Sequence, residues 1–215
     1  MKDLIIKSSV VNVTDIGPVN DEEKETIANT PRESDPAGIS STSVDKYFLW
    51  QLPDLHDRIL EAAYGYAQRV LGIPKEYELQ ITNSWLNDYK EGNHLGMHRH
   101  ANCLFVGSYT YLQPEDCSAY IGINCTENNS FEGLYCGFFE PTEYNNPYAE
   151  IPMEEGEVAF FPGYLLHGVG MNDSKQNRST IAFNVHFKGL IGDRDNYTEL
   201  YFGDLRDATT TKDNG

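Results

Sequence analysis

Two histidine-bearing segments, far apart along the chain, constrain this sequence most. Residues 92–100 read Gly-Asn-His-Leu-Gly-Met-His-Arg-His, and residues 160–169 read Phe-Phe-Pro-Gly-Tyr-Leu-Leu-His-Gly-Val. His98 and His100 are separated by one residue, so in an extended strand both imidazoles point to one side and can reach one metal ion. His167 can approach from another strand as a third ligand. Three protein ligands on one face of a metal leave positions open, as non-haem Fe(II) chemistry requires.

A second feature is Arg178, which opens the segment Arg-Ser-Thr-Ile-Ala-Phe-Asn. Its guanidinium carries a rigid fork of donors that suits a carboxylate. By strand alternation Thr180 shares the face of Arg178 and its hydroxyl can assist, while Ile181 and Phe183 pack on the other side. The alternative interpretation is a structural ion pair with one of the 33 acidic residues.

The order of these motifs resembles that of the Fe(II)/2-oxoglutarate-dependent oxygenases. Their common pattern runs from a Tyr and a Gly to His-x-Asp, a Tyr-rich strand, a distal His and an Arg. The corresponding residues here are Tyr89, Gly92, His98 and His100, Tyr109 and Tyr111, His167, and Arg178. The resemblance covers about 85–187, and it is closest to a bacterial and tailed-phage subgroup that carries His-x-His.

This resemblance implies a double-stranded β-helix that binds Fe(II), the cosubstrate 2-oxoglutarate and O2. The implied reaction is hydroxylation of a substrate, coupled to release of succinate and CO2 from 2-oxoglutarate. Arg178 would bind the distal carboxylate of 2-oxoglutarate, assisted by Thr180 and Tyr111. Tyr89 would lie near the metal-bound end of the cosubstrate.

The chain departs from the common pattern at His100, where most members carry Asp. A His98, His100 and His167 triad is neutral and leaves more net positive charge on the metal than a two-His, one-carboxylate site does. Two other groups remain candidates for the third ligand. Asn102 would give a His-x-Asn variant, and His94 lies just upstream.

Composition limits the partners and the compartment. The formal net charge of −17 disfavours nucleic acid, because phosphate binding needs clustered Lys and Arg, and it favours a cationic or neutral substrate. No apolar stretch is long enough to span a membrane, and charge interrupts the N-terminal segment too early for a signal peptide. The four cysteines lack Cys-x-x-Cys spacing. These features predict a cytoplasmic protein with reduced thiols, and the oligomeric state is left open.

The chain is predicted to form one mainly β domain over 1–215, a cupin-like jelly roll with a supporting N-terminal helix. Residues 1–76 should hold N-terminal strands, a polar loop and the helix, and 77–190 the β-helix core. The helix is expected at 54–71, where Pro53 precedes an apolar stripe and Gly72 follows it. A loop is expected at 140–152 and a frayed tail at 207–215. The predicted strands are 3–14, 77–90, 103–112, 118–123, 133–139, 157–162 and 179–187.

Two rival functions remain open on the sequence alone. One is a three-His non-haem iron oxygenase that does not use 2-oxoglutarate, in which Arg178 would hold the substrate's carboxylate. The other is a jelly-roll binding or structural module without catalytic activity. The substrate, whether a small molecule or a protein, is not indicated by the residues.

Overall fold

Strands make up most of the part of the chain that the computed structural model describes, which is residues 9–35, 39–124 and 148–204. The helices are α1 (Asp21–Asn29), the 3-10 helix η1 (Phe48–Gln51) and α2 (Pro53–Arg69). The strands are β1 (Asn12–Asp15), β2 (Arg32–Ser34), β3 (Ser41–Ser43), β4 (Glu78–Tyr89), β5 (Leu95–His98), β6 (Phe105–Leu112), β7 (Tyr120–Asn124), β8 (Tyr148–Pro152), β9 (Glu157–Pro162), β10 (Leu166–Val169), β11 (Arg178–Ile191) and β12 (Leu200–Phe202).

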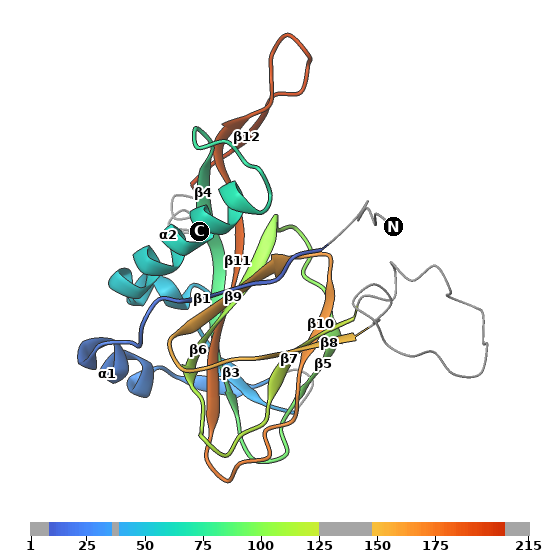
Figure 1. Cartoon of the computed structure of the whole chain (residues 1–215). Coiled ribbons are helices and arrows are strands. Elements are labelled where there is room, and N and C mark those ends of the chain that lie inside the picture. Colours follow the sequence, from blue (N-terminus) through green and yellow to red (C-terminus); the bar gives the residue numbers. More distant parts are fainter. Residues whose placement is uncertain (1–8, 36–38, 125–147, 205–215) are drawn as a thin grey trace, which may run out of the picture.

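The strands form two facing antiparallel sheets (Figure 1). The larger sheet has the order β1-β9-β6-β11-β4-β3-β2, with β12 paired to the far end of β11, and the smaller sheet has the order β5-β10-β7-β8. Strands adjacent in the sheets are often distant in the chain, as in a jelly roll. The predicted double-stranded β-helix with an N-terminal supporting helix is confirmed.

Helix α2 covers the outer face of the larger sheet, as Figure 1 shows. Pro53 occupies the first helical turn, where its missing N–H costs nothing, and Gly72 follows the helix with a φ of 70°. Leu55, Ile59 and Tyr66 fall at helical spacing and are fully buried against the sheet. The helix predicted for 54–71 is therefore present, with ends shifted by one or two residues.

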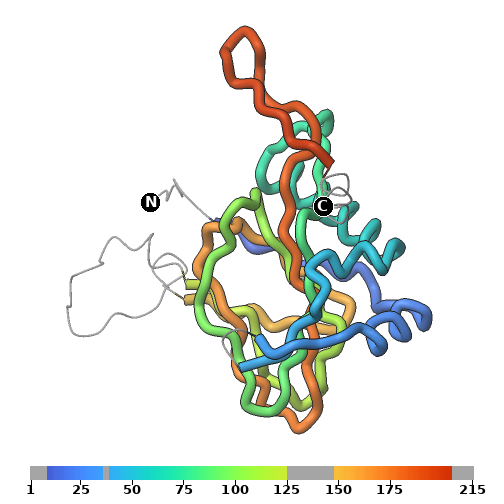
Figure 2. Tube along the Cα trace, turned by 180° about the vertical axis from the view of Figure 1, so that it is seen from behind, coloured from blue at the N-terminus to red at the C-terminus, as the bar shows by residue number. Residues whose placement is uncertain are grey.

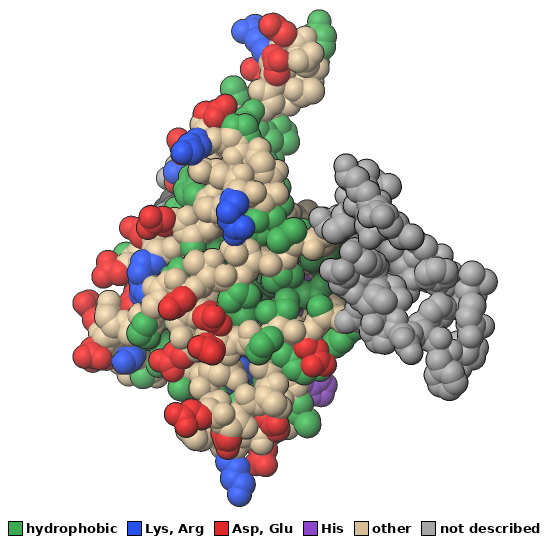
Figure 3. All heavy atoms as spheres, viewed as in Figure 1, with side chains coloured by type: hydrophobic (Ala, Val, Ile, Leu, Met, Phe, Trp, Pro, Cys, Tyr) green, Lys and Arg blue, Asp and Glu red, His purple; other side chains and the backbone are tan. Residues whose placement is uncertain are grey.

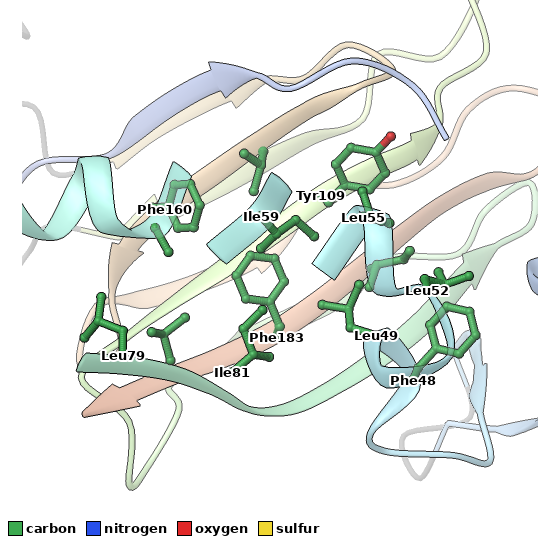
Figure 4. Close-up of a cluster of buried hydrophobic side chains, with 14 of the residues drawn as sticks. Phe48, Leu49, Leu52, Leu55, Ile59, Leu79, Ile81, Tyr109, Phe160 and Phe183 are labelled. Atoms are coloured by element: carbon green, nitrogen blue, oxygen red, sulfur yellow. The ribbon is translucent and has the colours of Figure 1, made fainter. Parts of the chain in front are cut away.

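Two apolar clusters hold the layers together. The larger lies between the helices and the larger sheet, where Phe183 of β11 meets Phe160 of β9 edge to face (Figure 4). Gly107 on β6 leaves room for the Phe183 ring, since a Cβ there would lie 2.2 Å from it. The smaller cluster fills the space between the two sheets and includes Val106, Ile121 and Phe161.

Helix α1 is fixed at its start and against α2. The Asn20 side chain accepts a hydrogen bond from the Glu23 N–H, and the Glu23 carboxylate accepts one from the Asn20 N–H, which is a reciprocal capping box. The same carboxylate, which is buried, pairs with Arg58 of α2 at 3.1 Å. This pair connects the two helices.

The two longest strands, β4 and β11, pair along most of their length, from Arg178 opposite Tyr89 to Lys188 opposite Glu78. A bulge interrupts the pairing next to Asn184. Beyond β4, the end of β11 and strand β12 form a hairpin that projects from the body of the molecule (Figures 1 and 2).

The predicted 140–152 loop is wrong at its end, since residues 148–152 form strand β8. These residues pair with β7, with Ile121 opposite Ile151, so sheet pairing overrides the local proline signals. Short strands β2 and β3 also occur within a stretch predicted to be mostly loop. The predicted strand 133–139, the remainder of the 140–152 loop and the 207–215 tail lie outside the described residues.

The acidic composition is visible on the surface. Asp and Glu side chains are spread over the face in Figure 3, with Lys and Arg side chains lying among them. Within the described residues, no helix has the length and apolar character that crossing a membrane requires.

Candidate metal centre

Three histidines converge where β5 and β10 lie side by side in the smaller sheet. His98, the last residue of β5, is the cross-strand partner of His167 on β10. Gly168 permits this approach, because a Cβ there would lie 2.7 Å from the Leu95 carbonyl oxygen. His100 lies beyond the end of β5, where its N–H donates to the Gly163 carbonyl at 3.0 Å. One ring nitrogen from each histidine lies within 4.8 Å of the other two.

The second ring nitrogen of each histidine is fixed by an oxygen acceptor. Nδ1 of His98 donates to the Gly96 carbonyl at 2.9 Å, and Nδ1 of His167 donates to the Leu165 carbonyl at 2.8 Å. Nδ1 of His100 faces the side-chain oxygen of Asn184 at 2.6 Å. In neutral imidazoles these contacts leave each Nε2 as an unprotonated acceptor, and the Nε2 atoms of His98 and His100 are only 3.2 Å apart. Two unprotonated ring nitrogens that face each other can bind one metal cation between them.

Burial favours the neutral form of the His100 and His167 rings. Burial lowers the pKa of His167 to about 4. The hydrogen bond to the Leu165 carbonyl raises this pKa in part, and the neighbouring His98 and His100 lower it further. Burial is also the main cause that lowers the pKa of His100. Trp85 stacks on His100 at 5.7 Å between ring centroids, and Phe161 meets His167 edge to face at 4.7 Å. Neutral imidazoles at a fixed orientation suit Fe, Zn, Cu or Ni.

Arg178 is the first residue of β11, six residues before the Asn184 that contacts His100, and it is completely buried. Its Nε donates to the Gln113 side-chain oxygen at 2.8 Å, and its two terminal nitrogens have no hydrogen-bond partner among the described residues. Burial lowers the pKa of Arg178, but its reference value is so high that the group stays charged. A buried cation without an acidic partner calls for an anion from outside the chain. This disfavours the structural ion pair that the sequence left open.

Three further groups share the end of the barrel with Arg178. The Tyr89 ring lies 5.7 Å from the guanidinium carbon, and burial raises the pKa of its hydroxyl to about 12. Thr180 lies near enough to interact with the Tyr89 hydroxyl. Thr110 of β6 is the cross-strand partner of Thr180, and its buried hydroxyl oxygen has no hydrogen-bond partner in the part of the chain described.

Tyr111 does not join this group, contrary to the expectation from the family pattern. The pairing of β6 with β11 steps from Leu112 opposite Ser179 to Thr110 opposite Thr180, which leaves Tyr111 as the extra residue of a bulge. Its ring packs against the core beneath the helices. The regular register that pairs Tyr109 with Ile181 continues to Thr110 opposite Thr180, so Thr110, and not Tyr111, lies beside Thr180.

The two alternative ligands also lie apart from the histidine cluster. His94 is exposed and is not part of the ligand group formed by the described residues. Asn102 lines a separate groove and has a φ of 56°. The structure thus brings together His98, His100 and His167.

Sequence reasoning missed Asn184, Gln113 and Thr110. Asn184 carried a signal, since it ends the strand motif that begins at Arg178 and lies on the same face by alternation. Gln113 had none, because it directly follows β6 and its position opposite Arg178 depends on the pairing of β6 with β11.

The space between the histidines and the sheet walls is small, about 40 Å³. Most of its walls are apolar or aromatic, including Trp85, Val106, Ile121 and Phe161. Such an enclosure excludes water from the reacting groups.

Comparisons with known proteins agree on one family. Residues 83–184 match the family model described as "Putative 2OG-Fe(II) oxygenase". None of the curated proteins matches the sequence. The matched segment contains the three histidines, Arg178, Thr110 and Gln113.

Solved structures share the fold at low sequence identity. The non-heme alpha ketoglutarate dependent carbocyclase SnoK from nogalamycin biosynthesis is 14% identical with a TM-score of 0.57, over 89% of this chain and 79% of that one. HygX from Streptomyces hygroscopicus, with nickel and 2-oxoglutarate bound, is 13% identical with a TM-score of 0.54, over 82% of each chain. A 2OG-Fe(II) oxygenase family oxidoreductase from Burkholderia pseudomallei is 14% identical with a TM-score of 0.53, over 76% of this chain and 75% of that one.

These structures establish the fold, and the family model covers the strands that carry the histidines and Arg178. The three-His cluster offers the chemistry that the family needs. The family match over residues 83–184 and the fold indicate a 2OG-Fe(II) oxygenase, and this family of oxidoreductases uses Fe(II), 2-oxoglutarate and O2.

Proposed function

We propose that His98, His100 and His167 are the Fe(II) ligands and that the enzyme hydroxylates its substrate. The observation that carries this proposal is the convergence of three Nε2 atoms whose rings are each fixed through Nδ1. A surface pair of histidines would not need three matched acceptors behind it. The hydrogen bond from His100 to Asn184 supports His100 as the third ligand over His94 and Asn102.

A neutral triad has an electrostatic consequence for cosubstrate binding. Three imidazoles leave the metal's double positive charge uncompensated by the protein, whereas an Asp ligand would cancel part of it. The attraction between the metal and the 2-oxoglutarate dianion is then stronger. We propose that this attraction, together with Arg178, holds the cosubstrate.

The distal carboxylate of 2-oxoglutarate is assigned to the Arg178 end of the barrel. The two terminal nitrogens of Arg178 and the Thr110 hydroxyl are buried donors without partners, and a carboxylate accepts such donors. Thr110 takes the role that the family pattern suggested for Tyr111. Thr180 and Tyr89 complete the donor set on the same face.

Gln113 contributes an uncharged hydrogen-bond acceptor to Arg178. Its side-chain oxygen holds the Arg178 Nε without bringing a negative charge. A carboxylate in that place would neutralise the guanidinium and compete with the cosubstrate. The amide therefore orients Arg178 and leaves its charge available to an incoming anion.

Bound Fe(II) and 2-oxoglutarate would supply O2 activation and C–H oxidation, with succinate and CO2 as coproducts. The residues of the chain position and shield that chemistry. Trp85 and Phe161 pack against the ligand rings and fix their planes. The apolar walls between the two sheets keep bulk water out. No side chain is required to transfer a proton in this scheme.

The proposal is tested by anaerobic titration of the purified chain with Fe(II). The parent should bind one Fe(II) per chain. His98→Ala and His167→Ala should abolish stoichiometric binding because each removes a ligand. His100→Ala should weaken binding, and His100→Asp should retain it, since a carboxylate is also an accepted ligand for Fe(II). His94→Ala is the matched control and should bind as the parent does.

Two results would contradict the assignment. Full occupancy in the double variant His98→Ala, His167→Ala would place the metal elsewhere. Parent-like affinity in His100→Ala, together with loss of binding in His94→Ala, would replace His100 as the third ligand.

A further inference from the structure

A polar groove, lined in part by Asn83 and Asn102, lies near the histidine cluster. Its volume is about 540 Å³, within the range of roughly 300–1,000 Å³ of small-molecule sites. The space inside the barrel, about 40 Å³, admits only a small part of any substrate. The body of the substrate must therefore lie outside, next to the metal site.

The groove and the metal site are linked at two positions. Asn83, in the groove, is the cross-strand partner of Asn184, whose side chain holds His100. Asn102, also in the groove, follows His100 by two positions in the chain. A ligand in this groove therefore lies next to a residue of the proposed ligand set.

The lining of the groove is uncharged. Nine described residues form it, and none is Asp, Glu, Lys or Arg, although charged residues are 23% of the chain. A charged ligand would find no counter-charge there, and burying its charge without a partner is costly. The groove thus fits a neutral ligand.

The groups that face this ligand are amides and rings. The Asn83 and Asn102 side chains line the groove, and each offers both a donor and an acceptor. The rings of His186 and Phe202 lie 4.3 Å apart at one end. Gln80 fixes that end, because its amide donates to the carbonyls of Phe187 and Gly203.

The floor of the groove is formed where β4 and β11 pair with each other, with His186 opposite Gln80, so the backbone groups that join these two strands are already used. The side chains that line the groove remain available to a ligand. Amides that pair with hydroxyl groups, beside aromatic faces that cover apolar sugar surfaces, match a carbohydrate.

We propose that this groove binds a neutral carbohydrate chain and presents one of its sugar carbons to the metal. The inference rests on the proposed function, since it names the substrate class of that site. Hydroxylation of a sugar C–H would then take one oxygen atom from O2, with 2-oxoglutarate as the reductant that is converted to succinate and CO2.

The test measures binding of neutral oligosaccharides to the full chain loaded with Zn(II) and 2-oxoglutarate, by saturation-transfer NMR and calorimetry. The probes are cellohexaose, maltohexaose and chitohexaose, with an uncharged alanine- and serine-based peptide as comparison. The test variant combines Asn83→Ala with Asn102→Gly, because glycine keeps the positive φ of Asn102. Asn29→Asp, an exposed change far from the groove in sequence, is the control.

At least one oligosaccharide should bind the parent and the control alike. The double variant should bind it about tenfold or more weakly, as expected for two lost hydrogen-bonding groups, while its affinity for Zn(II) and 2-oxoglutarate stays at the parent value. Binding of the peptide alone, no oligosaccharide binding, or equal binding by the double variant would overturn the proposal. Failure of the parent to bind metal or 2-oxoglutarate would instead reject the proposed function.

Discussion

At the scale of single residues, Arg178 gives the sharpest prediction. Its terminal nitrogens are buried without partners, so a carboxylate bound there makes charged hydrogen bonds worth roughly 1.5–3 kcal/mol. Arg178→Ala should weaken 2-oxoglutarate binding by about ten- to hundredfold, and Arg178→Lys should restore it only in part, because an ammonium lacks the fork. Calorimetric titration of the Ni(II)-loaded chain measures both effects.

Gln113→Glu completes this test. The new carboxylate would pair with Arg178 and compete with the cosubstrate, so 2-oxoglutarate binding should weaken although the hydrogen bond to Nε is kept. Metal affinity should not change in any of these variants. An unaltered dissociation constant for 2-oxoglutarate in Arg178→Ala would show that the carboxylate binds elsewhere.

The sequence predicted that the three histidines converge, but it did not predict the residues that orient them and Arg178. His98, His100, His167 and Arg178 follow from motif order and from strand alternation. Gln113 contacts Arg178 because it directly follows Leu112, which pairs with Ser179, and this register depends on the fold. Tyr111 was misplaced because it shares a face of β6 with Tyr109, toward the core beneath the helices, whereas Thr110 between them points to the other face.

At the scale of elements, the junction of α1 and α2 depends on Glu23. Its buried carboxylate closes the capping box and pairs with Arg58. Glu23→Ala removes both interactions and leaves Arg58 without its partner, so the free energy of unfolding should fall by about 2–4 kcal/mol. Glu23→Gln should cost less, because glutamine still accepts from the Asn20 N–H. Urea denaturation measures each loss.

Glu22→Ala is the control for this prediction, since Glu22 is exposed on the same turn of α1. Its effect should stay within about 0.5 kcal/mol. If Glu23→Ala were no more destabilising than Glu22→Ala, the contact between the two helices would carry no stability.

Elements with strong local signals were predicted well. Helix α2 is indicated in the sequence by Pro53 and an apolar stripe. The predicted bounds of β9, 157–162, are those of the structure. Strand β8 was predicted as loop because it is held by its pairing with β7, which a local pattern does not contain. A local sequence pattern does not predict strands that form only because a distant strand pairs with them.

At the scale of the whole molecule, the two sheets contribute different parts of the site. His98 and His167 belong to the smaller sheet, whereas Arg178, Thr110 and Tyr89 belong to the larger one. A cosubstrate that reaches from the metal to Arg178 would therefore connect the sheets. Ligand binding should stabilise the fold as a whole, since the unfolded chain does not bring these groups together.

Thermal unfolding measures this coupling. A ligand at about a hundred times its dissociation constant adds about 2.7 kcal/mol, and for a chain of this size each kcal/mol raises Tm by roughly 2–4 °C. Ni(II) should raise Tm by about 5–11 °C, and 2-oxoglutarate should raise it further only when Ni(II) is present. The double variant His98→Ala, His167→Ala should show neither shift. A rise in Tm with 2-oxoglutarate alone, equal to that with both ligands, would mean that the cosubstrate does not connect the sheets through the metal.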